Sequence, residues 1–100
     1  MIVRYKNKKI EKICTDYNLA VKKYNSAMAN YIKLSIQALQ IYDSVEEIVK
    51  DKVRGCHSLK QNRAGQFSMH LQEPYRLIFE KEGDDGIVHI VMVEEIVDYH

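Results

Sequence analysis

The last three residues of the sequence can each exchange a proton. Asp98, Tyr99 and His100 supply a carboxylate, a phenol and an imidazole. They directly follow an apolar, strand-like run, IVHIVMVEEIV. Terminal residues are usually expendable unless the fold holds them in place, so a strand that ends on this set is a candidate for delivering chemistry to a site.

A second set of candidates lies in a basic stretch, KDKVRGCHSLKQNR, at residues 50–63. It holds five Lys or Arg against one Asp, and it includes His57, Lys60 and Arg63. Arg76 adds a charge within a predicted strand, where an unpaired charge is costly unless it faces a site. On charge alone, a solvated surface is the favoured interpretation of the basic stretch.

These residue types suit RNA cleavage without a metal. One group removes the proton of the ribose 2′-hydroxyl, another protonates the leaving 5′-oxygen, and cations stabilise the charge that develops on the phosphate. Imidazoles, a phenol, a carboxylate and several cations are the required parts.

Other chemistries lack the spacing that they need. There is no CxxC, HxxxH or HExxH pair, so the sequence predicts no metal site and no cofactor. There is also no GxSxG turn to present a nucleophilic serine. His70 and His89 lie in predicted strands between apolar neighbours, which is more typical of structural histidines.

Composition indicates one soluble globular domain over residues 1–100. The chain is 46% hydrophobic and 29% charged, with a net charge of +1, and it has no apolar run of membrane-spanning length. The first residues, MIVRYKNKKIEK, become charged too early for a signal peptide. Cys14 and Cys56 form no motif and are expected to be reduced thiols. We therefore expect a cytoplasmic protein without a membrane partner.

The first half of the chain reads as a short strand followed by helices. Residues 1–5 are strand-like, and Asn7 is a candidate N-cap for a first helix. A long helix is predicted over residues 19–42, where polar residues recur every three or four positions. SVEE, at residues 44–47, is a capping box that opens a short helix ending at Gly55.

The second half changes to the period of two that is typical of strands. QFSMHL and YRLIFEK alternate apolar and polar residues, with turns predicted at residues 72–74 and 82–86. The run that follows is apolar on both faces, as a central strand would be. The predicted class is α+β, with an N-terminal strand and two to three helices packed on an antiparallel meander. In such a meander the loop that enters the first strand and the end of the last strand can meet at one edge.

Three ordered motifs over residues 56–100 carry a family resemblance. CHSLKQNRAGQFSMHL, PYRLIF and EIVDYH resemble the RelE/ParE superfamily of bacterial type II toxins, in its HigB-like killer-protein branch. That branch typically shows a His–x–Leu–Lys stretch, then Arg–x–Gly–x–aromatic, an aromatic–Arg–aliphatic strand and a closing Asp–Tyr–His. Residues 1–55 agree only in length and in the order strand, helix, helix.

The resemblance implies a RelE-like fold and an endoribonuclease, an mRNA interferase that cuts message in the ribosomal A site. It also implies a cognate helix-turn-helix antitoxin, HigA-like, encoded beside the toxin. The antitoxin would neutralise the toxin, and operator DNA would be contacted only through the complex of the two.

The resemblance also assigns roles, position by position. Arg76 matches a strand arginine that contacts phosphate, and Arg63 is a second candidate phosphate contact. Two departures bear on the loop that carries the predicted catalytic lysine: Gln61 stands where many relatives have glycine, and Ser58 replaces a common proline. The residues that match the catalytic set of the family are His57, Lys60, Asp98, Tyr99 and His100.

Two other functions remain open. A ParE-like toxin would keep the fold and poison DNA gyrase by binding it, but such relatives lack the His/Lys/Tyr-His set. A non-catalytic module could instead act with its antitoxin in repression of their own promoter. Growth arrest on induction without the partner separates this last possibility from the other two.

Overall fold

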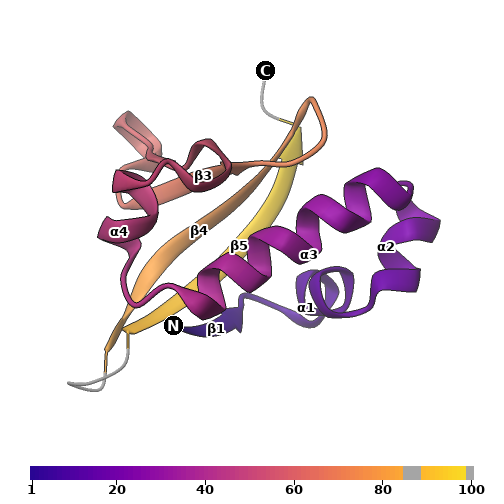
Figure 1. Ribbon diagram of the computed structural model, residues 1–100, viewed down its shortest axis with the longest axis horizontal. Helices are drawn as coiled ribbons and strands as arrows, with labels where there is room; N and C mark the ends of the chain where they lie inside the picture. The colour runs from indigo at the N-terminus through magenta and orange to yellow at the C-terminus, as the bar shows by residue number, and fades with distance from the viewer. Residues whose placement is uncertain (85–88, 99–100) are drawn as a thin grey trace.

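The computed structural model describes residues 1–84 and 89–98, and within them the chain forms a five-stranded sheet in the order β1-β5-β4-β3-β2 (Figure 1). β1 runs parallel to β5, and the other neighbouring strands pair antiparallel. β5 therefore lies inside the sheet, as its apolar sequence predicts. The strands are β1 (Ile2–Tyr5), β2 (His57–Ser58), β3 (Gln66–His70), β4 (Tyr75–Asp84) and β5 (His89–Asp98).

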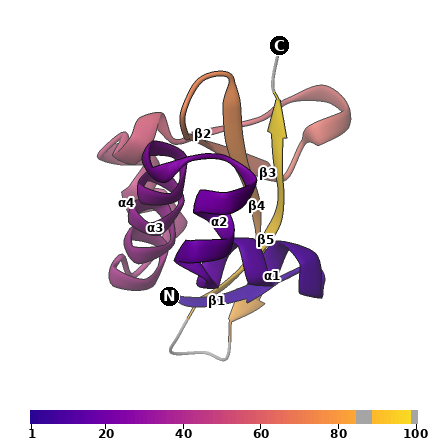
Figure 2. The same cartoon turned by 90° about the vertical axis from the view of Figure 1, so that its right-hand side faces the viewer.

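Helices cover one face of this sheet. Figure 2 shows α3 and α4 stacked on the same side of β4 and β5. Two short 3₁₀ turns, Val53–Gly55 and Gln61–Arg63, flank β2. The α-helices of the described residues are α1 (Lys8–Thr15), α2 (Tyr17–Lys23), α3 (Ser26–Ile41) and α4 (Val45–Lys50).

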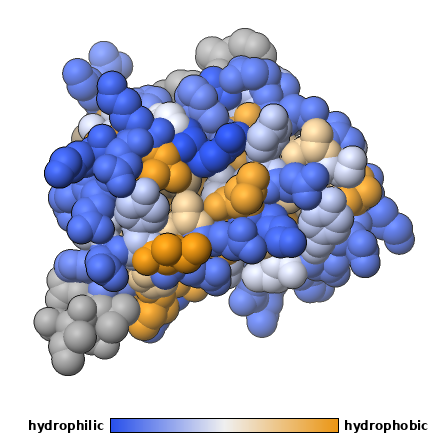
Figure 3. All heavy atoms as spheres, viewed as in Figure 1, coloured by the Kyte–Doolittle hydropathy of each residue, from blue (hydrophilic) through white to orange (hydrophobic). Residues whose placement is uncertain are grey.

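The core lies between the helices and the inner face of the sheet. Met69, Leu77 and Phe79 point from β3 and β4 toward the helices and are completely buried. Figure 3 shows a mostly hydrophilic surface over the helical side, with apolar side chains gathered along α3. The helical residues that complete the core include Met28, Ile32, Ile36, Leu39, Val45 and Ile48.

The predicted α+β class is confirmed, but the helix expected over residues 19–42 is two helices. Tyr24 leaves the helical conformation, with φ −119° and ψ −93°, and ends α2. Asn25 then starts α3, because its Oδ1 accepts a hydrogen bond of 2.8 Å from the Met28 N–H. The break falls inside an uninterrupted amphipathic pattern, which is why periodicity alone joins the two helices.

The capping prediction at Ser44 is confirmed, whereas the predicted end of that helix is wrong. The Ser44 hydroxyl accepts a hydrogen bond of 3.2 Å from the Glu47 N–H. The α-helix stops at Lys50, and a separate 3₁₀ turn continues the chain to Gly55. Lys52 adopts a left-handed conformation, with φ +53°, between the two, and this interrupts the helical hydrogen bonds.

Replacing Asn25 by alanine should lower the free energy of unfolding by about 1 kcal/mol, as expected for the loss of an N-cap. The Asn25 side chain also ties α3 to the β3–β4 turn, because its Nδ2 donates to Gln72 Oε1 at 2.9 Å. Urea denaturation measures the change. The matched control is Asn30→Ala, at an exposed position inside α3, where alanine should be neutral or slightly stabilising. Equal losses in the two variants would contradict the capping role.

The outer face of the sheet, which is the side away from α3 and α4, is partly covered by residues 59–65. Ile78 is completely buried on this face, and Leu59 is 8% exposed. Arg63 reaches from this segment to β5, where its Nη1 lies 3.5 Å from Glu95 Oε2. Figure 2 shows the segment on the opposite side of β5 from α3. The loop with the predicted catalytic lysine therefore packs on the outer face.

Candidate functional site

His57 and Arg76 project from the same, outer face of the sheet. His57 lies opposite Ser68 of β3, and Ser68 lies opposite Ile78 of β4. Side chains two residues apart in a strand share a face, so Arg76 points the same way as Ile78. His57 Nδ1 lies 3.1 Å from Gly55 O. A carbonyl only accepts, so Nδ1 carries the hydrogen and Nε2 is left for proton transfer.

Two contacts hold the guanidinium of Arg76 at the start of β4. Nη1 donates to Tyr75 O at 2.9 Å, and Nη2 lies 3.1 Å from Glu73 Oε1. The Arg76 side chain is only 16% exposed, and pairing offsets the cost of sheltering its charge. Glu73 is itself exposed, so this ion pair is weak and a phosphate can compete for the guanidinium.

The end of β5 lies beside Arg76. Val97 pairs with Arg76, and Asp98 pairs with Tyr75. Strand alternation therefore places Asp98 on the opposite face from Arg76, toward the helical side of the sheet. The other two predicted residues of the tail, Tyr99 and His100, lie outside the described residues.

His57 and Asp98 do not meet at one edge of the sheet, contrary to the expectation from a simple meander. β3 and β4 lie between their strands, and three steps of about 4.8 Å place β2 and β5 about 14 Å apart across a flat sheet. The reason is that β1 pairs with β5 while β2 adds to the other side. The start of β2 and the end of β5 still lie at the same end of the sheet.

Lys60 and Arg63 differ in how many contacts they make with other residues. Lys60 is exposed at the start of the Gln61–Arg63 turn. Arg63 Nη1 donates to Gln66 Oε1 at 2.9 Å and also lies near Glu95, so its charge helps to hold the loop on the sheet. Gln61 adopts φ +59°, a left-handed conformation that favours glycine, which is the residue that the resemblance leads us to expect at this position.

A pocket of about 340 Å³ opens beside the β3–β4 turn, at the same end of the sheet. Arg54 forms part of its wall: Nε and Nη2 donate to His70 O at 3.3 and 3.1 Å, and the guanidinium lies 4.4 Å from the centre of the Tyr31 ring. His70 is exposed and lines the pocket. From the sequence, Arg54 is one of several charges in the basic stretch and His70 has the pattern of a structural histidine, so neither is predicted to line a pocket.

His70 is surrounded by charged groups from several elements. Partial burial, followed by the positive charge of Arg76, lowers the pKa of its imidazole. His57 and Arg54 lower it further, while Glu73 acts in the opposite direction. The neutral form of His70 is therefore favoured relative to a free histidine.

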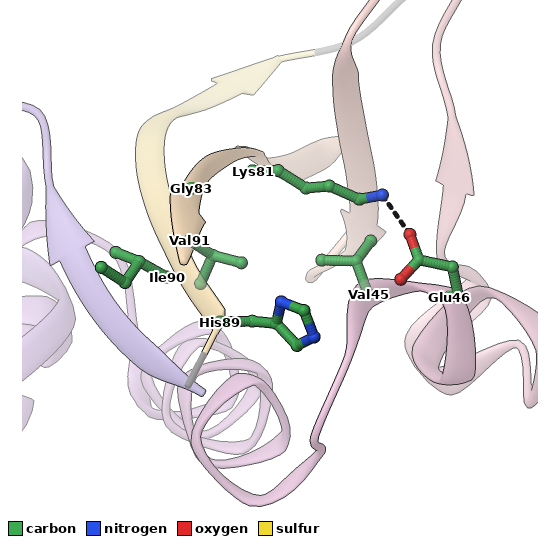
Figure 4. A pocket seen from close by; sticks show the side chains of 7 residues that line it. All are labelled: Val45, Glu46, Lys81, Gly83, His89, Ile90 and Val91. Atoms are coloured by element: carbon green, nitrogen blue, oxygen red, sulfur yellow. Dashed lines mark hydrogen bonds and ion pairs between the residues drawn. The ribbon is translucent and has the colours of Figure 1, made fainter. Parts of the chain in front are cut away.

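A second pocket, of about 160 Å³, lies at the opposite end of the sheet (Figure 4). Lys81 of β4 forms an ion pair with Glu46 of α4 along its rim. The hydrogen bond from Lys81 lowers the pKa of Glu46. Figure 4 shows the imidazole of His89 pointing into the space between β5 and Val45. This ion pair ties α4 to the sheet far from the predicted catalytic residues.

Cys14 and Cys56 are free thiols. Burial raises the pKa of each to about 12, so neither offers a thiolate nucleophile at neutral pH. Over residues 1–84 and 89–98, no three His, Cys, Asp or Glu side chains are grouped as metal ligands would be. No helix in the described part of the chain is long and apolar enough to cross a membrane.

The order and packing of the elements match those of a solved toxin structure. A solved YoeB/ParE toxin from Agrobacterium tumefaciens aligns over 100% of both chains, with a TM-score of 0.64 and 15% sequence identity. At this identity the likeness shows the fold alone. No protein-family model and no curated protein matches the chain. The predicted fold is therefore confirmed, and the HigB-like branch remains a prediction.

Proposed function

We propose that this protein is the toxin of a type II toxin–antitoxin system and acts in the cytoplasm as a ribosome-dependent mRNA endonuclease. The fold shared with a YoeB/ParE toxin and the HigB-like motifs of the second half support this proposal. The observation that carries it is the placement of His57, Arg76 and the end of β5 at one end of the sheet. Proton-transfer groups and a phosphate-binding cation are thereby within reach of one RNA segment.

The proposed reaction needs no metal or cofactor. The 2′-hydroxyl attacks its own 3′-phosphate, and Arg76 stabilises the extra negative charge on the phosphate. His57, Lys60 and the Asp98–Tyr99–His100 tail are the candidate groups for the proton transfers. Arg63 is at most an accessory phosphate contact, because Gln66 and Glu95 already engage its guanidinium.

The ribosome and an antitoxin are the proposed partners. A net charge of +1 gives little affinity for long RNA, because binding strength scales with the phosphates neutralised. The ribosome would instead present the message in a fixed position. A HigA-like helix-turn-helix antitoxin, encoded beside the toxin, would neutralise it and carry the complex to operator DNA.

Induction of the chain without any neighbouring gene should arrest growth and produce new mRNA 5′ ends that map to translated codons. Purified protein should cleave message on programmed ribosomes but leave naked RNA nearly intact. With ribosome integrity controlled, cleavage should persist in EDTA and leave a 2′,3′-cyclic phosphate or a 3′-phosphate. Products with 3′-hydroxyl ends would exclude the 2′-hydroxyl mechanism.

Gyrase poisoning is the second candidate function, because the similar structure is named a YoeB/ParE toxin. The same induced cells distinguish the two activities. A gyrase poison would inhibit supercoiling by purified gyrase and leave mRNA ends unchanged. A module that acts only in repression would neither arrest growth nor cleave message.

A further inference from the structure

His70 lies between His57 and Arg76, the two described residues that are central to the proposed reaction. It pairs directly with Arg76 across β3 and β4. It also follows Ser68 by two residues on the outer face, and Ser68 is the partner of His57. In an antiparallel pair, such diagonal neighbours remain within reach of long side chains. His57, His70 and Arg76 therefore form a continuous row on three adjacent strands.

The imidazole of His70 lies close to Gly55. A Cβ added at Gly55 would lie 2.9 Å from both Nε2 and Cε1 of His70, so this edge of the ring packs on the glycine backbone. Nδ1 lies farther from this position than Nε2 does, and it is the nitrogen assigned to take the proton. The carbonyl of the same Gly55 receives the hydrogen bond of His57. One glycine thus positions both imidazoles.

The backbone around His70 is also held in place. Arg54 donates two hydrogen bonds to the His70 carbonyl and stacks on Tyr31. Arg54 adopts φ +49°, a left-handed conformation that is strained for a residue other than glycine. Such strain persists only where surrounding contacts enforce it, and here it directs the guanidinium to the wall of the pocket.

We propose that His70 is the general base of the RNA cleavage reaction, with His57 as the general acid, and that the pocket beside Arg54 holds the ribonucleotide that carries the attacking 2′-hydroxyl. This inference rests on the proposed function and adds to it a residue that is not in the catalytic set implied by the resemblance. A general base must be neutral at the start of the reaction in order to accept the proton. The neutral form belongs to His70, which Arg54, Arg76 and His57 surround, with Glu73 the one opposing charge.

The proposed reaction transfers two protons and exchanges one phosphorus–oxygen bond for another. The O2′–H bond breaks and its proton passes to Nδ1 of neutral His70, while the O2′–P bond forms. The P–O5′ bond then breaks, and the leaving O5′ takes a proton from Nε2 of protonated His57. The products are a 2′,3′-cyclic phosphate and a free 5′-hydroxyl, and proton exchange with water restores both histidines.

The test compares His70→Asn with His89→Asn, the same substitution at the other end of the sheet, in single-turnover cleavage on programmed ribosomes. The His70 variant should slow cleavage by about 10²–10⁴-fold, as expected for the loss of a general base. The rate of the unmodified protein should rise with pH as His70 loses its proton, and the variant should lack this rise. The His89 variant should match the unmodified protein in rate and pH profile.

A chemically modified mRNA substrate distinguishes the role of His57 from that of His70. Replacing the scissile 5′-oxygen by sulfur gives a leaving group that departs without protonation, because thiols are far more acidic than alcohols. This substrate should rescue His57→Gln but not His70→Asn. Gly55→Ala provides an independent variant, since its methyl group would displace the His70 ring; it should also slow cleavage, with thermal melts run beside every assay.

A folded His70→Asn protein that cleaves within about threefold of the unmodified rate and keeps its pH profile overturns the inference and leaves the proposed function standing. Rescue of His70→Asn by the sulfur substrate would reverse the acid and base assignment and so also overturn it. Failure of the unmodified protein to cleave any message would instead reject the proposed function.

Discussion

Replacement of Phe79 by alanine should lower the free energy of unfolding by about 3–5 kcal/mol, the usual cost of emptying a buried phenylalanine site. Phe79 is completely buried between Phe67 and Val93 on the inner face of the sheet. Its ring stacks on that of Phe67 with centroids 5.5 Å apart. Domains of this size have about 5–15 kcal/mol of stability in total, so the variant should lose about a fifth of it or more.

Urea denaturation of the Phe79 variant, followed by circular dichroism, measures this loss. Ile41→Ala is the matched control, because Ile41 is 77% exposed at the end of α3 and its removal should change stability by less than about 0.5 kcal/mol. Phe67→Ala should fall between the two, since Phe67 is half-buried. A loss below 1 kcal/mol at Phe79 would mean that the core does not depend on the β3–β4 aromatic pair.

The strands of the second half could be predicted because side-chain alternation reports directly on burial. Met69, Leu77 and Phe79 point inward in the structure as the sequence indicates. The position of β5 inside the sheet follows from its apolar character on both faces. Its parallel partner β1 was not predictable, because a four-residue strand contains no information about the strand with which it pairs.

The helices show where periodicity stops being informative. α2 and α3 share one amphipathic pattern, and the only local sign of the break is Asn25, whose side chain caps α3. In the sequence alone, an asparagine that caps a helix cannot be distinguished from one that lies on the polar face of a longer helix. The loop over the outer face was equally hidden, since it depends on a long-range contact between Arg63 and Glu95.

His70 could have been found from the sequence. A turn centred on Glu73 places His70 and Arg76, each three residues away, directly opposite each other, and the structure has this register. The apolar neighbours of His70 along its own strand indicate a structural histidine, because the pattern of one strand does not show which residue lies opposite on the next strand. Cross-strand partners, not sequence neighbours, decide which polar side chains share a site.

Arg76→Ala should slow cleavage on programmed ribosomes by about 10²–10³-fold, the cost of removing one donor that stabilises transition-state charge. Folding should be little affected, because the ion pair that is lost involves the exposed carboxylate of Glu73. Arg76→Lys keeps the charge but not the two-pronged donor geometry, so it should recover only part of the rate. Arg4→Ala, at an exposed ion pair on β1, should leave cleavage unchanged.

The pH dependence of the Arg76 variant gives a second, independent result. The positive charge of Arg76 lowers the pKa of His70, so its removal should raise that pKa. If neutral His70 is the base, the rise of rate with pH should then move to higher pH in Arg76→Ala and stay near its original position in Arg76→Lys. A slower reaction with an unmoved profile would leave Arg76 as a phosphate contact and separate it from the proton transfer.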